Sequence, residues 1–211
     1  MEQDYQSIRS DIYLVLAALF RQAPSDEMLA FLSSLETESA DSAMKQAWQQ
    51  ISRAAQDSQT TSLADEYQEL FIGIGRGEVM PFASWHLTGS LMEKPLADIR
   101  HDLELLGFER APSVKEPEDH ISALCEVMAA LTNEAEQIQQ RFFNRHIAPW
   151  FESLIKQIVQ ARHANFYQSV AQLCLAFFTI EQVRFSENPT SSKNRVKIDV
   201  KNVTEYEQPQ S

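Results

Sequence analysis

Apolar residues recur at helical spacing along almost the whole chain. Four stripes are clear, and they consist of Met44, Ala47, Trp48, Ile51 and Ala55; of Leu96, Ile99, Leu103 and Leu106; of Trp150, Leu154, Ile155, Ile158 and Val159; and of Phe166, Val170, Leu173, Cys174 and Phe177. Residues three and four positions apart share one face of an α-helix, so each stripe predicts a helix with a buried face. Alternation typical of strands is missing, except in "RVKIDV" near the C-terminus. We therefore predict an all-α protein, a bundle of about nine to eleven helices.

Residues that favour helix ends flank several of these stripes. Asp41 precedes the first stripe as a candidate N-cap. Pro95 stands at the expected first position of the second helix and Gly107 just past its end. Pro149 opens the third helix in the same way.

Two stretches interrupt the helical pattern. "FIGIGRGEVMPFASWH" holds three of the five glycines, at positions 73, 75 and 77, and predicts a loop. "FERAPSVKEPEDH" carries Pro112 and Pro117 and is the best candidate for a linker. We therefore expect an N-terminal helical region at 1–110, a hinge at 111–118, a C-terminal helical region at 119–185 and a polar tail at 186–211. A hinge of this kind favours exchange between protomers, so we expect a monomer that also forms a domain-swapped homodimer.

The net charge of −12 argues against a protein that binds nucleic acid or docks on an anionic membrane. It suits a cationic partner, although many soluble proteins are acidic for solubility alone. The N-terminus is acidic where a signal peptide would be basic, and no stretch approaches the roughly 18 apolar residues of a membrane span. The two cysteines, Cys125 and Cys174, lie in apolar helical runs and predict core residues in a reducing compartment. We expect a cytoplasmic protein without stable membrane insertion.

Motifs for metal or nucleotide chemistry are incomplete. The glycine loop lacks the lysine of a phosphate-binding loop, and its glycines have the wrong spacing for a dinucleotide site. His101 and Asp102, with His86 before them, are similar to part of the ligand set of helical metal phosphohydrolases. His101, however, falls on the face of its helix opposite the apolar stripe. We expect no metal and no cofactor, and a small helical metal- or nucleotide-dependent hydrolase stays open as the alternative.

The stretch "EPEDHISALCEVMAAL" (116–131) packs four charged or titratable residues before an apolar run. Pro117 suits the first position of a helix, and Glu118 and Asp119 then fall in its first turn, where the helix dipole favours negative charge. Asp119 is expected to be in contact with water at this junction. His120 is explained less well, since a protonated histidine is disfavoured there. Asp119 and His120 therefore either begin a helix or present an acceptor and a switchable donor to a ligand.

Four segments together resemble the TorD family of cytoplasmic chaperones for twin-arginine-exported molybdoenzymes. They are "DEYQELFIGIGRGEVMPFASWH", "KPLADIRHDLELLGF", "EPEDHISALCEVMAAL" and "RFFNRHIAPWFESL", and the resemblance spans about residues 5 to 185. It implies an all-helical fold and a protein that is not an enzyme. It also implies binding of the twin-arginine leader and the apo-form of a reductase before molybdenum cofactor insertion, with trimethylamine N-oxide reductase as the expected client.

The resemblance also implies which residues recognise the leader: Tyr67, Leu70, Phe71, Pro81, Ser84, Asp119 and His120. The first of these is often tryptophan in the family, so Tyr67 is a mild departure. Tyr67, Leu70 and Phe71 share one apolar helical face, which serves either as core or as a peptide groove. The family has been linked to weak guanine-nucleotide binding, for which this sequence carries no phosphate motif. A helical adaptor with another partner is the remaining alternative.

Overall fold

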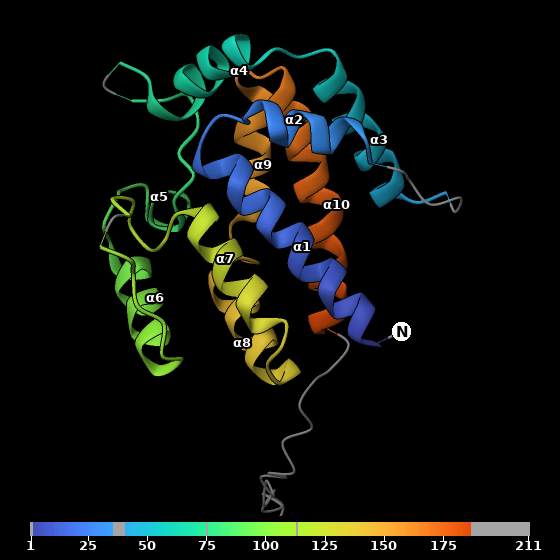
Figure 1. The fold of residues 1–211 in the computed structure, drawn as a ribbon. Helices are drawn as coiled ribbons and strands as arrows, with labels where there is room; N and C mark the ends of the chain where they lie inside the picture. Colours follow the sequence, from blue (N-terminus) through green and yellow to red (C-terminus); the bar gives the residue numbers. More distant parts are fainter. Residues whose placement is uncertain (1, 36–40, 75, 113, 187–211) are drawn as a thin grey trace, which may run out of the picture.

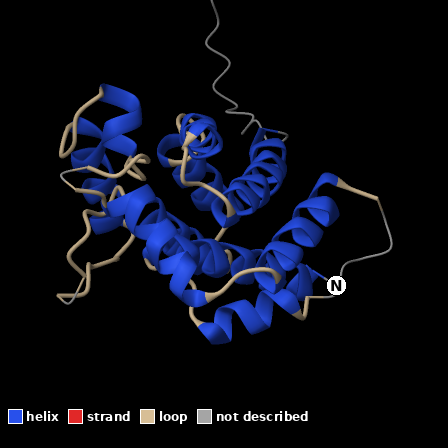
Figure 2. Ribbon diagram, turned by 90° about the horizontal axis from the view of Figure 1, so that it is seen from above, coloured by secondary structure: helices blue, strands red, loops and turns tan. Residues whose placement is uncertain are grey.

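The structure is a computed structural model that describes residues 2–35, 41–74, 76–112 and 114–186. The described residues form ten α-helices and one short π-helix, η1. The helices are α1 Glu2–Arg21, α2 Asp26–Ser33, α3 Ala43–Gln56, α4 Thr60–Tyr67, η1 Gln68–Ile72, α5 Ala83–Thr88, α6 Lys94–Leu105, α7 Ile121–Leu131, α8 Glu136–His146, α9 Phe151–Gln160 and α10 Phe166–Ser186. No strand occurs among these residues, as Figure 2 shows, so the prediction of an all-α fold is confirmed. "RVKIDV" lies outside the described residues.

Each of the four apolar stripes corresponds to a helix, namely α3, α6, α9 and α10. Pro95 lies in the first turn of α6, and Gly107 follows its end with φ +77°, a backbone conformation that glycine adopts without steric cost. The predicted cap of α3 is wrong by one residue. Ser42, not Asp41, is the N-cap, because its hydroxyl accepts the backbone N–H of Lys45 at 3.0 Å.

Helix α10 lies at the centre of the molecule. Figure 1 shows α1 crossing in front of it, and α3, α8 and α9 also pack against it. Its buried residues share one broad face and include the aromatic residues Phe166, Tyr167, Phe177, Phe178 and Phe185. The opposite side of α10 carries the exposed residues Leu175, Ile180 and Val183, so the helix buries one broad face.

One hydrophobic core spans both predicted helical regions. Helix α1 packs on α7, and α3 packs on α10, so elements from either side of the predicted hinge share this core. Cys125 and Cys174 are buried in it as free thiols, as predicted. The division at 111–118 and the domain-swapped dimer stay predictions. Ser186, the first residue of the predicted tail, is the last residue of α10, and the rest of the tail lies outside the described residues. No described helix is long and apolar enough to cross a membrane.

The glycine-containing loop is shorter than the sequence indicated. Its first residues end η1, and Ala83 already begins α5. Between them the chain folds back, so that the N–H of Val79 donates to the carbonyl oxygen of Leu70 at 2.8 Å. Gly77 is required at this crossing, because a Cβ atom there would lie 2.4 Å from the same carbonyl oxygen.

A buried charged network fixes α1 on its neighbours. Arg9 donates to both carboxylate oxygens of Glu181 on α10, at 2.8 and 2.6 Å, and to Gln139 on α8 at 3.0 Å. Tyr13 donates to the same carboxylate at 2.8 Å. Arg9 and Glu181 are 1 % and 0 % exposed. A bidentate pair with further hydrogen bonds satisfies both charges, which is the condition for keeping them away from water.

Glu181→Ala is expected to lower the free energy of unfolding by about 3–5 kcal/mol, because it leaves the Arg9 guanidinium buried without its carboxylate. Glu136→Ala is a matched control. Glu136 on α8 pairs with Arg184 on α10 at 2.9 Å, but the side chains of this pair are partly exposed. The control is expected to cost no more than about 1 kcal/mol. Urea unfolding of both variants measures the difference, and equal losses would contradict the assigned role of the buried pair.

Candidate functional site

The prediction that a helix begins at Pro117 is wrong. The stretch before α7 instead connects the starts of two helices. Helix α7 begins at Ile121, and His120 is its N-cap, with Nδ1 accepting the N–H of Ser122 at 3.1 Å. Asp119 serves a different helix, because its Oδ2 accepts the N–H of Ser84 in the first turn of α5 at 2.9 Å. Two neighbouring residues thus supply acceptors to the ends of two helices, where backbone N–H groups lack partners.

Backbone pairing reinforces this junction. Asp119 accepts the N–H of Ala83 at 3.0 Å, and Ile121 donates to the carbonyl oxygen of Pro81 at 2.9 Å, which forms an isolated antiparallel bridge. Asp119 is 1 % exposed and His120 6 %, so the expectation that Asp119 contacts water is wrong. Tertiary pairing, which the helix-dipole argument does not include, decides the position of both side chains. The same pairing brings four predicted site residues together, namely Pro81, Ser84, Asp119 and His120.

The environment of His120 favours its neutral form. Burial, and then the positive charge of Arg21, lowers the pKa of His120 to about 4. Phe82 contacts the imidazole edge-to-face, with ring centroids 5.0 Å apart. Since Nδ1 accepts a hydrogen bond, the proton of the neutral ring lies on Nε2. His120 is therefore a fixed acceptor at neutral pH and does not switch there.

Acid is expected to destabilise the protein through His120. Its pKa is depressed in the folded state, so the unfolded chain binds the proton first as pH falls from about 6.5 towards about 4. The free energy of unfolding should therefore fall by about 2 kcal/mol between pH 7 and pH 5 from this group alone. His120→Asn keeps a capping acceptor and removes the titration, so it should reduce this pH dependence in urea unfolding. His101→Asn on the exposed face of α6 is the control, and an unchanged pH dependence in His120→Asn would contradict the assignment.

The other three predicted site residues lie on the core side of α4 and η1. Leu70 is fully buried, and Tyr67 donates to the carbonyl oxygen of Phe20 at 3.1 Å. The ring of Phe71 lies 5.0 Å from those of both Tyr67 and Tyr167. Among the described residues, no hydrogen bond or ring contact joins this aromatic group to the Asp119–His120 junction. From the sequence, the face of Tyr67, Leu70 and Phe71 could serve either as core or as a peptide groove. In the structure it packs mainly against the core.

Two of the three residues that suggested a metal hydrolase, His86 and Asp102, are engaged by protein partners, and the third, His101, lies on the exposed face of α6. Asp102 is 5 % exposed and accepts from Arg145 and from His146, both within 2.8 Å. Burial alone would raise the pKa of Asp102, but the hydrogen bond from His146 and the charge of Arg145 outweigh it and lower that pKa. Both ring nitrogens of His86 already have hydrogen-bond partners, since Nδ1 contacts the hydroxyl of Ser153 and Nε2 contacts the carbonyl oxygen of Met80. Within the described ranges, no group of three His, Cys, Asp or Glu side chains is placed to hold a metal ion.

A cavity of about 270 Å³ lies beside the junction, between α6, α7, the end of α1 and the loop that joins α6 to α7. We call it the hinge cavity. Its apolar wall consists of Leu103, Phe108, Ala111, Val114, Ala123 and Val127. Its charged rim consists of Glu109, Glu116, Glu118, Glu126, Arg21 and Arg110. An apolar interior with an acidic rim is the chemistry that a cationic, partly apolar ligand requires.

Arginines of the chain itself pair with this rim. Glu118 contacts two of them, because Arg100 Nε lies 2.9 Å from Oε2 and Arg110 Nε lies 3.5 Å from Oε1. Glu126 on α7 pairs with Arg21 at the end of α1. Burial, and then the negative charge of Glu116, raises the pKa of Tyr67 to about 12, so the rim also acts electrostatically on a predicted site residue.

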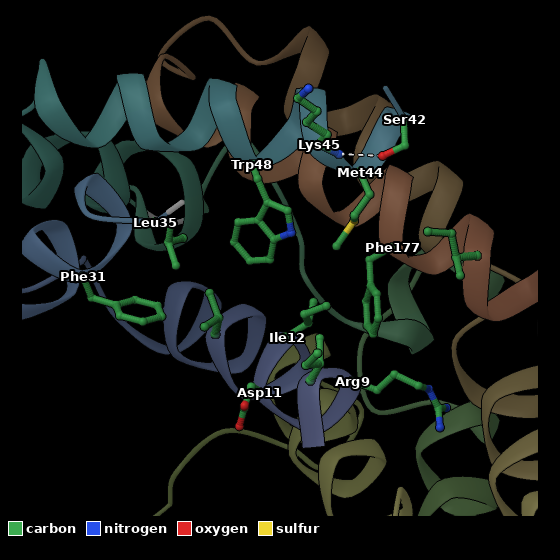
Figure 3. A pocket seen from close by; sticks show the side chains of 13 residues that line it. Arg9, Asp11, Ile12, Phe31, Leu35, Ser42, Met44, Lys45, Trp48 and Phe177 are labelled. Carbon is green, nitrogen blue, oxygen red and sulfur yellow. Dashed lines mark hydrogen bonds between the residues drawn. The ribbon is translucent and has the colours of Figure 1, made fainter. Parts of the chain in front are cut away.

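A second and larger cavity, of about 480 Å³, lies between α1, α2, α3 and α10 (Figure 3). Figure 3 shows Phe31, Trp48 and Phe177 around it, with Asp11 and Lys45 towards its edge. It contains none of the seven predicted site residues, and it has one carboxylate, that of Asp11. Size alone would favour this cavity, but its lining lacks the acidic rim of the hinge cavity.

Sequence analysis found part of the hinge cavity. Glu116 and Glu118 belong to the stretch that was singled out, where Glu118 was assigned to the first turn of a helix. Arg21 and Glu126 gave no signal, because 105 positions separate them in the chain and ordinary helical patterns surround both. The apolar wall was hidden in the predicted linker, where Phe108 and Val114 were counted as loop residues.

Comparison with known proteins identifies the family. The family model described as nitrate reductase delta subunit matches residues 37–156, more than half of the chain. The chain belongs to this family, the TorD-like chaperones that its motifs resemble. The chaperone protein TorD of Vibrio cholerae (strain M66-2) is 28 % identical over 80 % of this chain and 88 % of its own length. TorD of Vibrio parahaemolyticus is 25 % identical over 82 % and 92 %.

The fold comparison agrees with this family. A crystal structure from Archaeoglobus fulgidus, assigned to redox enzyme maturation, superposes with a TM-score of 0.55 and 20 % identity, over 82 % of this chain and 93 % of the other. This likeness concerns the fold alone. These TorD relatives are chaperones, which agrees with the prediction that the chain is not an enzyme. The hydrolase alternative is not favoured.

Proposed function

We propose that the chain is a cytoplasmic, system-specific chaperone that binds the twin-arginine leader and the apo-form of a molybdoenzyme. It keeps this client competent for insertion of the molybdenum cofactor before export. The proposed client is trimethylamine N-oxide reductase, because the resemblance to TorD implies it. The similarity to TorD relatives over most of the chain supports this choice.

The hinge cavity is the observation that carries this proposal. A twin-arginine leader combines two adjacent guanidinium groups with an apolar segment. The cavity offers four glutamates at its rim and an apolar wall behind them. Guanidinium–carboxylate hydrogen bonds are stronger than neutral ones, and the net charge of −12 attracts a cationic peptide over a longer range. The leader would place its arginines at the rim and its apolar segment along Val114 and Phe108.

The seven residues implied by the resemblance then act mainly by positioning. Asp119 and His120 hold the start of α7 against the start of α5, and with it the wall that carries Ala123 and Val127. Pro81 and Ser84 are the other half of that pairing. Tyr67, Leu70 and Phe71 anchor the glycine-containing loop to the core. Substitutions at these seven residues would weaken leader binding through the shape of the cavity.

Calorimetric titration with a synthetic leader peptide tests the location. Val114→Lys removes apolar surface and adds a like charge inside the hinge cavity, so it should weaken leader binding roughly ten-fold or more. Phe31→Lys is the matched control, because it makes the same change of charge at the rim of the larger cavity. The control should bind within about two-fold of wild type. If Phe31→Lys loses binding while Val114→Lys keeps wild-type affinity, the site lies in the larger cavity. If the wild-type protein binds no twin-arginine leader, the proposed function is refuted.

We also propose that the chaperone works without a bound metal or organic cofactor. The described side chains that carry metal-ligand chemistry, such as Asp102 and His146, are satisfied by each other and by Arg145. Elemental analysis of purified protein after a chelator wash should therefore show less than one tenth of an equivalent of zinc, iron or manganese, well below the roughly one equivalent that a structural metal site retains. One equivalent of any of these metals would contradict the proposal. Binding of guanine nucleotide in a parallel titration would restrict the proposal to metals.

A further inference from the structure

Glu118 is arranged as a receptor for two guanidinium groups. One of its carboxylate oxygens lies 2.9 Å from Arg100 Nε, and the other lies 3.5 Å from Arg110 Nε. The two arginines come from different segments, α6 and the loop that follows it. The side chain of Glu118 is 14 % exposed, so its position is set by its surroundings and not by solvent.

The arginines themselves are held loosely. The side chains of Arg100 and Arg110 are 54 % and 43 % exposed, whereas Glu118 is nearly buried. Exposed cations gain little from an ion pair, because water solvates them almost as well. A carboxylate in a mostly buried position, by contrast, requires a cationic partner. Exchange of one guanidinium for another therefore keeps Glu118 paired at every stage.

The second pair at the rim has the same character. Arg21 and Glu126 have side chains that are 45 % and 41 % exposed and lie at the edge of the same cavity. Arg110 also donates to the carbonyl oxygen of Glu116 at 3.4 Å, which ties the loop to the segment that carries Glu118. Arginines of the chain itself thus pair with two of the four glutamates of the rim, Glu118 and Glu126.

We propose that these arginines are intramolecular placeholders for the arginine pair of the leader, and that leader binding proceeds by exchange of guanidinium groups at Glu118. This inference rests on the proposed function. Its ligand is a peptide with two adjacent arginines, each of which takes over one oxygen of Glu118 from Arg100 or Arg110. Because lysine is a point charge and lacks the planar fork of a guanidinium, a lysine pair would replace the placeholders poorly.

Removing a placeholder should strengthen leader binding. We expect Arg110→Gln to bind a twin-arginine peptide up to about five-fold more tightly, since no internal cation then competes. Glu118→Gln should weaken binding about ten-fold or more. In the double variant the gain from Arg110→Gln should vanish, because both changes act on the same carboxylate.

Arg53→Gln on α3 is the control for net charge, since it removes one exposed arginine outside the cavity lining. Calorimetric titrations use peptides with an arginine pair, a lysine pair and a glutamine pair, and thermal melts check folding of each variant. Equal affinities of Arg110→Gln and Arg53→Gln, or wild-type affinity in folded Glu118→Gln, would refute exchange while leaving the proposed function intact. If Glu118→Gln does not fold, the comparison of Arg110→Gln with Arg53→Gln decides alone. Wild-type protein that ignores all three peptides would refute both the exchange and the function.

Discussion

The buried pair of Arg9 and Glu181 constrains the molecule more than any other contact. Two charges without access to water are stable only in one geometry, in which every oxygen of the carboxylate has a donor. Apolar packing tolerates small shifts, but a bidentate ion pair does not, so this contact fixes the register of α1 on α10. About 18 Å further along the same helix, α1 places Arg21 at the hinge cavity. The core network and the candidate site are therefore coupled through one rigid helix.

The junction at Asp119 and His120 is the second constraint, because it ties the start of α7 to the start of α5. Both side chains satisfy backbone N–H groups at helix starts, and their burial requires those bonds. The walls of the hinge cavity follow from this arrangement, because α7 carries one of them. In the proposed function, their neighbours Glu116 and Glu118, which line the hinge cavity, would serve the ligand. Adjacent residues of one short stretch would then divide the support of the fold from the recognition of the ligand.

The stripes of α3, α6, α9 and α10 could be predicted because their apolar periodicity is local. The start of α7 could not, since Pro117 and His120 are both acceptable beginnings, and pairing with residues 81–84 decided between them. Arg9 was equally hidden, because a charged residue in a helical pattern predicts an exposed position. Of the candidate site, Glu116 and Glu118 were visible in the sequence. Their partners Arg21, Arg100 and Arg110 depend on tertiary packing and leave no local pattern.

An acidic rim around an apolar cavity creates a problem when no ligand is bound. Like charges at close range repel, and the surplus of negative charge over the whole chain adds to this repulsion. Internal arginines relieve part of it, because Arg21 pairs with Glu126, and Arg100 and Arg110 contact Glu118. The same arrangement sets a threshold for ligands, since any cation that enters must outcompete a guanidinium already in place. In the proposed exchange, a peptide with a single weakly placed charge would not meet this threshold, whereas two adjacent arginines would. Selectivity would then come from competition within the chain as much as from contacts with the client.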